Sequence, residues 1–178
     1  MTDEQLIEGC VKGDRVAQKK LYEKYAGKMM GVCLRYADSH DDATDILQDG
    51  FIKVFDKLSS YEQKGSFEGW IRRIVVNTAL DHLRKNKHMR FSVDIDEAEY
   101  LAPSDNDDAF SRLATEDLLN ILQKIPSGYR AVFNMYVIEG YSHKEIADEL
   151  DISVNTSKSQ FSRAKAFLRN IVEQYDLR

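Results

Sequence analysis

The stretch YSHKEIADELDISVNTSKSQFSRAKAFLR, residues 141–169, decides the fold of this chain. Ser142 and Glu145 have the spacing of a capping box, which predicts that a helix begins there. After a turn at Asp151, Ser153 predicts the N-cap of a second and longer helix. Two helices joined by a tight turn, with the second helix basic, are typical of a helix-turn-helix unit that binds DNA.

The second of these helices is predicted to have an inward and an outward side. Its inward side holds Val154, Phe161, Ala164, Leu168 and Val172. Its outward side, the candidate DNA contact, holds Asn155, Lys158, Ser159, Ser162 and Arg163. Asn and Ser are poor helix formers but suit base edges and phosphate oxygens, which favours DNA binding over a merely solvated face.

The composition indicates a globular, all-α protein of one or two small domains. The chain has 178 residues, of which 43% are hydrophobic and 31% charged, and helical periodicity dominates without an alternating strand pattern. No apolar run approaches the roughly 20 residues that span a bilayer, and the N-terminus does not resemble a signal peptide, so a cytoplasmic location is expected. Cys10 and Cys33 are predicted to be reduced packing thiols.

The charge distribution divides the chain. The net charge is -5, but seven acidic residues and no Lys or Arg lie between Val93 and Asp108. This acidic, proline-containing segment, 93–108, is predicted to be a linker. It separates a helical domain at 1–92 from a second one at 109–178, which ends in the helix-turn-helix. Without the linker, basic residues exceed acidic ones, which suits a nucleic-acid partner.

The first domain is predicted to contain four helices. Their start signals are Thr2, Asp14, Ser39 and Ser66. The inward positions of the second and third are Ala17, Leu21, Tyr25, Met29, Val32, Tyr36, Ile46, Leu47, Phe51, Val54 and Leu58. In the second domain, helices are expected at about 109–125 and at 127–139, before the helix-turn-helix. The core residues predicted there are Leu118, Leu122, Val132, Phe133 and Tyr136.

An acidic stripe runs along the third helix. Asp42, Asp45 and Asp49 lie within about 60° of one another on a helical wheel, with Gln48 alongside. A metal site is one interpretation, but carboxylates on a single helix lack the wrapping loop and further ligands of known metal sites. A solvated face is another. The third is docking against a basic partner helix, which the neighbouring Phe51 and Ile52 would help to anchor.

The fourth helix presents a second candidate nucleic-acid surface. Arg73, Asn77 and Arg84 share a side opposite the core positions, with Asp81 at its edge. Just before this side, Tyr61, Phe67 and Trp70 lie in or beside a loop that contains Lys64. Aromatic rings near cations suit unstacked single-stranded bases, although Phe67 and Trp70 could instead cover the core at the start of the helix.

Three motifs, in this order, resemble a bacterial sigma factor of the extracytoplasmic-function (ECF) type, over nearly the whole chain. DDATDILQDGFIKVF, residues 41–55, looks like the core-polymerase-binding helix of that family. SFEGWIRRIVVNTALDHLRK, residues 66–85, looks like its minus-ten promoter helix. The helix-turn-helix at 141–169 looks like its minus-thirty-five reader. Ser157 and Gln160 depart from the family pattern, since an apolar residue and an Arg are usual there.

The resemblance implies a role for each motif. It implies that the clamp coiled coil of the largest subunit of core RNA polymerase binds Asp42, Asp45, Gln48, Asp49 and Phe51. It implies that the minus-ten DNA binds Phe67, Trp70, Arg73, Asn77, Asp81 and Arg84. It implies that the minus-thirty-five DNA binds Asn155, Lys158, Ser159, Ser162 and Arg163. An anti-sigma factor is a further implied partner.

The same resemblance implies a protein that is not an enzyme, with no catalytic residue, cofactor, metal or small-molecule substrate. Two alternatives compete with it. A stand-alone helix-turn-helix regulator would leave the acidic stripe without a purpose. A DNA-processing enzyme such as a recombinase would need a nucleophile with convergent metal carboxylates or an arginine cluster, and no Ser or Tyr here has such neighbours.

Overall fold

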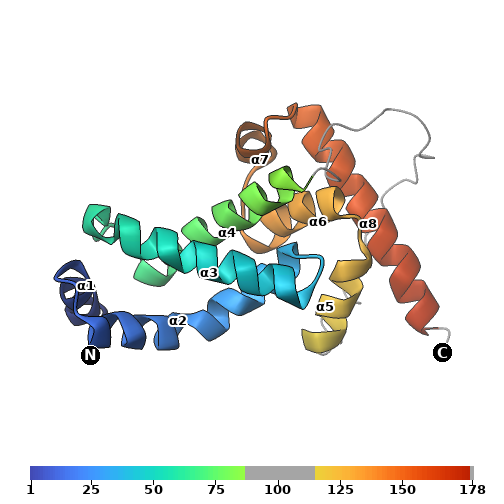
Figure 1. Ribbon diagram of the computed structural model, residues 1–178. Coiled ribbons are helices and arrows are strands. Elements are labelled where there is room, and N and C mark those ends of the chain that lie inside the picture. Colours follow the sequence, from blue (N-terminus) through green and yellow to red (C-terminus); the bar gives the residue numbers. More distant parts are fainter. Residues whose placement is uncertain (87–114, 177–178) are drawn as a thin grey trace. The chain divides into compact units, whose positions relative to one another are not determined.

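The computed structural model describes residues 1–86 and 115–176. The chain divides into two compact units, Met1–Lys85 and Asn86–Arg178. The described residues form helices and no strand, which confirms the all-α prediction (Figure 1). The predicted domain boundaries at residues 92 and 108, and the acidic linker between them, lie outside the described residues.

The first unit begins its helices at the predicted capping residues. The helices are α1 (Asp3–Val11), α2 (Arg15–Tyr36), α3 (His40–Lys57), a short 3-10 turn (Leu58–Ser60) and α4 (Phe67–Lys85). Thr2 and Gln5 form a full capping box, and the Asp14 carboxylate accepts a hydrogen bond from the Val16 amide. Ser39 and Ser66 cap α3 and α4 through their hydroxyl oxygens. Local sequence therefore fixes where each helix begins.

The core of the first unit lies where α2, α3 and α4 pack on one another, as Figure 1 shows. All the predicted inward residues of α2 and α3 are buried. The short helix α1 packs on α2, and Gly9 approaches so closely that an added Cβ would lie 2.6 Å from the Cβ of Ala17. The absence of a side chain at Gly9 is thus what permits this contact.

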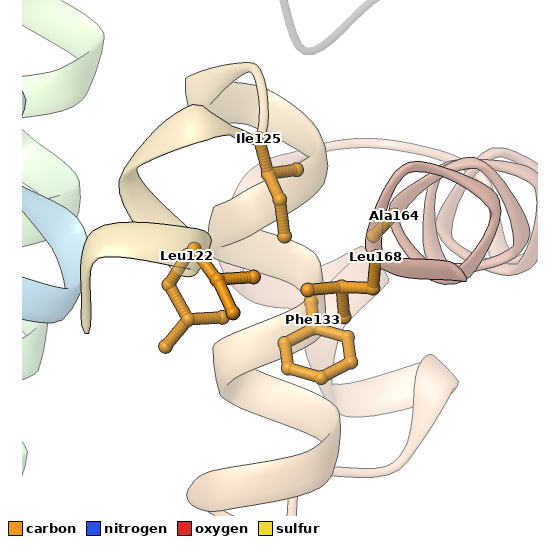
Figure 2. Packing of buried hydrophobic residues seen from close by; sticks show 6 residues of the cluster. Leu122, Ile125, Phe133, Ala164 and Leu168 are labelled. Atoms are coloured by element: carbon orange, nitrogen blue, oxygen red, sulfur yellow. The ribbon is translucent and has the colours of Figure 1, made fainter. Parts of the chain in front are cut away.

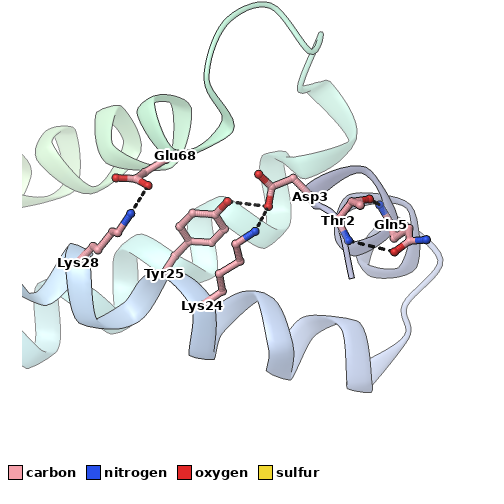
Figure 3. Close-up of polar contacts among 7 residues, drawn as sticks. All are labelled: Thr2, Asp3, Gln5, Lys24, Tyr25, Lys28 and Glu68. Carbon is pink, nitrogen blue, oxygen red and sulfur yellow. Dashed lines mark hydrogen bonds and ion pairs between the residues drawn. The ribbon is translucent and has the colours of Figure 1, made fainter.

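Polar contacts secure α2 to its neighbours (Figure 3). Lys24 Nζ and Tyr25 Oη each donate to the Asp3 carboxylate at 2.7 Å, which joins α2 to α1. Burial alone would raise the pKa of Asp3, but these hydrogen bonds outweigh it and lower the pKa. Lys28 Nζ lies 2.6 Å from Glu68 Oε2 and joins α2 to the first turn of α4. The start of α4 is therefore held in place from α2.

Replacing Gly9 by Ala is expected to destabilise the first unit by about 1–3 kcal/mol, because the new methyl group would overlap Ala17 in a packed contact. Gly31 provides the matched control, since an added Cβ there meets no atom within 4 Å. Gly31→Ala should raise stability by about 0.5–1 kcal/mol through helix propensity. Thermal unfolding of both variants measures the difference, and equal effects would contradict the close packing of α1 on α2.

The second unit is built around its last helix. Its described elements are α5 (Thr115–Lys124), α6 (Ser127–Phe133), a π-helical turn (Asn134–Ile138), α7 (His143–Leu150) and α8 (Val154–Asp176). Helix α8 packs on α5, α6 and α7. Figure 2 shows the side chains of Leu122, Ile125, Phe133 and Leu168 converging to form the core.

Two residues predicted in this core lie outside it. Tyr136 is 40% exposed and stacks on the His143 ring at 4.4 Å between centroids, and Val154 is 39% exposed in the first turn of α8. The inward positions of that part of α8 belong instead to Ser157 and Gln160, both fully buried. Ser157 can occupy such a site because its hydroxyl hydrogen-bonds His143 Nδ1 at 2.9 Å.

Candidate nucleic-acid and partner-binding surfaces

The outward face of α3 combines charge with an apolar residue. Asp45 and Gln48 are exposed, and Ile52 follows them on the same side with 59% of its side chain exposed. These three residues are called the docking face below. An exposed aliphatic residue on the same side of a helix as a carboxylate and an amide is typical of a protein-binding patch that combines apolar and polar contacts.

Three other residues predicted on this surface have contacts within the first unit. Phe51 is only 2% exposed and packs edge-on against Tyr22 at 4.7 Å, so its ring belongs to the core and Ile52 takes the exposed position. Asp42 accepts a hydrogen bond from the Ser39 hydroxyl at 2.7 Å. Asp49 Oδ2 lies 2.8 Å from His82 Nε2 on α4. The prediction that Phe51 is a surface anchor is therefore corrected, because its side chain faces inward.

The basic side of α4 is largely accessible. Arg73 and Arg84 are exposed, and Asn77 is half-buried between them on the same side. Asp81, predicted as a polar reader, already has two cations on its carboxylate: Lys53 Nζ at 3.0 Å and Arg84 Nη1 at 3.0 Å. Its charge is thus engaged within the first unit, unlike the amide of Asn77.

The three aromatic residues before this side of α4 pack together. The centroid of the Tyr61 ring lies 5.1 Å from the ring centroids of both Phe67 and Trp70. The centroids of Phe67 and Trp70 lie 5.8 Å apart. Phe67 is 5% exposed, whereas Trp70 is half-buried, so only the indole of this pair has a surface for a partner. In the connecting loop, Gln63 and Gly65 have positive φ angles of 55° and 85°, and Tyr61 Oη donates to the Gly65 carbonyl oxygen at 3.1 Å.

The helix-turn-helix forms as the sequence predicts. Ser142 and Glu145 make a full capping box, and Asp151 adopts the left-handed conformation at φ 54° to end α7. Ser153 then caps α8 by accepting a hydrogen bond from the Thr156 amide at 2.9 Å. The two helices are therefore joined by a turn of three residues, which places the first turns of α8 at the surface.

The outward face of α8 carries most of the predicted DNA contacts. The exposed members are Asn155, Lys158, Ser159 and Ser162. Arg163 is half-buried, and its guanidinium donates to Tyr129 Oη at 3.1 Å and lies 5.7 Å from the centre of that ring. The helical pattern could not reveal Tyr129 as a partner, because the contact joins residues 34 positions apart.

The environment of His143 favours the neutral form of its ring. Burial lowers the pKa of His143, and the charges of Lys158 and Lys165 lower it further. A neutral imidazole suits the stack on Tyr136 and the hydrogen bond to Ser157. Two basic residues of α8 therefore favour the neutral form of a ring that supports this same helix.

The described residues offer little for covalent or metal chemistry. Burial raises the pKa of Cys33 to about 12, and burial followed by the charge of Asp14 raises the pKa of Cys10. Both thiols are reduced and stay protonated. Within 1–86 and 115–176, no group of three or more His, Cys, Asp or Glu side chains is placed to hold a metal ion. No helix of that part is long and apolar enough to cross a membrane.

Comparison with protein families identifies both units separately. Residues 21–89 match the model of Sigma-70 region 2. Residues 115–168 match that of Sigma-70 region 4. The first match contains the docking face and α4, and the second contains the helix-turn-helix.

Characterised proteins are similar over the full length. The ECF RNA polymerase sigma-E factors of Escherichia coli (strain K12) and Salmonella typhimurium (strain LT2) are each 31% identical to this chain. In both cases the similarity covers 97% of this chain and 95% of the relative. The sigma-E factor of Haemophilus influenzae is 28% identical over 97% of this chain and 96% of its own length.

Two solved structures share the fold. The sigma factor RpoE of Bartonella quintana, solved with the anti-sigma factor NepR, has a TM-score of 0.54 and 21% identity, covering 87% of this chain and 96% of that one. CnrH, solved with the cytosolic domain of CnrY, has a TM-score of 0.52 and 22% identity, covering 97% of both chains.

Proposed function

Because this chain belongs to the ECF group of sigma-70 RNA polymerase sigma factors, we propose that it binds core RNA polymerase through the docking face and reads promoter DNA with α4 and α8. As a sigma factor it directs core RNA polymerase to promoters and assists strand opening. The polymerase then supplies the chemistry, and this chain works as a non-enzymatic subunit in the cytoplasm. The stand-alone regulator is the less favoured alternative.

The docking face supports polymerase binding by its composition. Asp45 supplies negative charge, and Ile52 supplies exposed apolar area about two turns further along the same side of α3. A basic partner helix, which in this family is the clamp coiled coil of the largest subunit, would gain electrostatic complementarity at the rim and buried area at Ile52. Asp42 and Asp49 would add to the negative potential while keeping their contacts with Ser39 and His82.

Helix α4 and the loop before it are proposed to hold the opened minus-ten element. Arg73 and Arg84 are placed to contact phosphates, and the half-buried Trp70 offers a ring for an unstacked base. Asn77 lies between them with an amide that can both donate to and accept from a base edge. Strand opening would thus be driven by binding energy, since stacking of a base on an aromatic ring contributes about 1–3 kcal/mol.

Helix α8 is proposed to enter the major groove at the minus-thirty-five element. Its capped start and its exposed Asn155, Lys158, Ser159 and Ser162 are the observation that carries the proposal most directly. Lys158 would contact a phosphate, and the short polar residues would reach base edges. Arg163, which donates a hydrogen bond to Tyr129, would contribute a further contact to the DNA.

We also propose that an anti-sigma factor controls this chain. A solved relative of the same fold binds the anti-sigma factor NepR. A protein that covered the docking face or the DNA-binding helices would keep the chain from polymerase. The uncovered apolar side chain of Ile52 is a suitable contact for such a partner.

Transcription with purified core polymerase tests the function. The chain should bind core enzyme stoichiometrically without DNA and should confer initiation on genomic fragments, with start sites that share two upstream elements. A stand-alone regulator would instead bind DNA by itself and leave core enzyme unbound. Absence of any start site with active core enzyme would refute the proposed role.

Replacing Asn77 by Ala should impair strand opening more than closed-complex formation. A lost base contact of about 1–3 kcal/mol predicts a decrease of roughly 5- to 150-fold in open complex. Permanganate footprinting reports open DNA, and gel shift on duplex promoter reports the closed complex. Asn120→Ala, at an exposed position of α5, is the matched control. Equal losses in both assays would argue against base capture by Asn77.

A further inference from the structure

The side chain of Lys53, on α3, contacts the neighbouring helix α4. It follows Ile52 of the docking face, yet its ammonium reaches across to α4, where Nζ lies 3.0 Å from Asp81 Oδ2. Both side chains are partly shielded, with relative exposures of 40% for Lys53 and 43% for Asp81. Lys53 therefore belongs to the contact between the docking helix and the DNA-binding helix.

The carboxylate of Asp81 links Lys53 to a predicted DNA contact. Asp81 Oδ2 accepts a hydrogen bond from Lys53 Nζ. Asp81 Oδ1 accepts one from Arg84 Nη1, and each donor lies 3.0 Å from its acceptor. A second polar contact, between Asp49 Oδ2 and His82 Nε2 at 2.8 Å, joins the same two helices one residue further along α4. The last turns of α4 are thus fixed from α3 by two side-chain pairs.

Removing Lys53 would change the charge available at Arg84. With Lys53 present, the Asp81 carboxylate is shared between two cations, so it offsets less of the positive charge with which Arg84 attracts a phosphate. Without Lys53, the Asp81 carboxylate would act more strongly on Arg84 and would weaken the attraction of Arg84 for a phosphate. The carboxylate would also lose the contact that fixes its orientation from α3.

We propose that Lys53 is a positioning residue for minus-ten DNA, acting through Asp81 on Arg84. This inference rests on the proposed function of α4. The ligand is the phosphate backbone of the opened promoter strand, and Lys53 itself does not touch it. The polymerase-binding helix thereby prepares the DNA-binding helix of the same unit.

The test uses holoenzyme formed from the full chain. The probe is a fluorescent single-stranded oligonucleotide with the non-template minus-ten sequence of a promoter mapped with this protein. Lys53→Met should lower its affinity about two- to fivefold, the range of a partly exposed ion pair. The slope of log affinity against log salt should fall by about 0.7, the value for one phosphate contact on a single strand. Lys53→Arg should restore both quantities.

Controls separate positioning from a general effect. Lys57→Met removes a cation from an exposed position one turn later in α3 and should leave DNA affinity unchanged. Binding to core enzyme and the melting temperature should stay at wild-type values in Lys53→Met. Because Lys53 acts through Arg84, Lys53→Met should have little further effect in an Arg84→Ala background.

Three outcomes would overturn the inference. These are wild-type DNA affinity in Lys53→Met, full additivity with Arg84→Ala, or a loss confined to core binding. If wild-type holoenzyme fails to bind the oligonucleotide, the proposed function of α4 fails and the inference with it. If wild type binds and Lys53→Met binds equally, only the role of Lys53 is refuted.

Discussion

Replacing Asp45 by Lys is expected to abolish stoichiometric binding of this chain to core RNA polymerase. Asp45 is the acidic residue of the docking face and lies about two turns before the exposed Ile52, on the same side of α3. Against a basic partner helix, the new ammonium would replace attraction by like-charge repulsion, which costs several kcal/mol at an interface. A loss of about 3 kcal/mol corresponds to a more than hundredfold decrease in affinity. Co-elution on size exclusion and fluorescence anisotropy with core enzyme measure it.

Asp45→Lys should leave the fold of the first unit unchanged. Asp45 is exposed, so helical content and melting temperature should match wild type. Glu23→Lys is the control, because it makes the same charge change at an exposed position of α2 in the same unit. Ile52→Ser should weaken core binding as well by removing exposed apolar area. Wild-type affinity of Asp45→Lys for core enzyme would place the docking site elsewhere.

Replacing Phe133 by Ala is expected to unfold the second unit while the first unit stays folded. Phe133 is 8% exposed and lies in the cluster of Figure 2 with Leu122, Ile125 and Leu168. Truncating a buried phenylalanine costs about 3–5 kcal/mol, a large part of the roughly 5–15 kcal/mol by which whole domains are stable. Hydrogen exchange should show lost protection in α5–α8 and retained protection in α2–α4.

The effect of Phe133→Ala on binding should likewise be confined to the second unit. Phe133→Ala should lose binding to duplex DNA carrying the minus-thirty-five element but keep affinity for core enzyme through the docking face. Phe167→Ala is the control, since that ring is 41% exposed on α8 and its removal should change stability little. Simultaneous loss of protection in α2–α4 would show that the two units do not fold independently.

Helix starts and most core positions could be predicted from the sequence because they depend on local chemistry. Thr2, Asp14, Ser39, Ser142 and Ser153 all cap the helices that they were predicted to begin. The long helices α2 and α3 repeat their apolar residues often enough for the buried side to be unambiguous. Resemblance to a family then predicted what the residues alone left open, namely which partner each surface would meet.

Positions near helix ends were harder to predict because the apolar pattern there is short. Tyr136 and Val154 are apolar or aromatic at plausible inward spacings, yet both lie at the surface. Ser157 and Gln160 are polar and depart from the family pattern, yet both are buried. Periodicity cannot identify a buried polar residue whose partner is distant in sequence, as Ser157 and His143 are.

The sequence predicted on which helix, and mostly on which side of it, each candidate site residue lies, and the roles of these residues stay predictions. Contacts between helices decided the rest: Phe51 packs on Tyr22, and Asp81 is held by Lys53. Neither contact follows from the spacing of residues along one helix. Lys53 in particular would be expected to pair with Asp49, one turn earlier on α3, rather than with a residue on α4.

The burial of Ser157 and Gln160 bears on how this protein could be redesigned. The buried residues that seat α8 in its unit are separate from the exposed Asn155, Lys158, Ser159 and Ser162, so the two sets can be varied independently. Transplanting only the outer side chains of another sigma factor onto this scaffold should therefore transfer that donor's upstream sequence preference. A library that randomises those outer positions would sample new promoter specificities without sacrificing foldability.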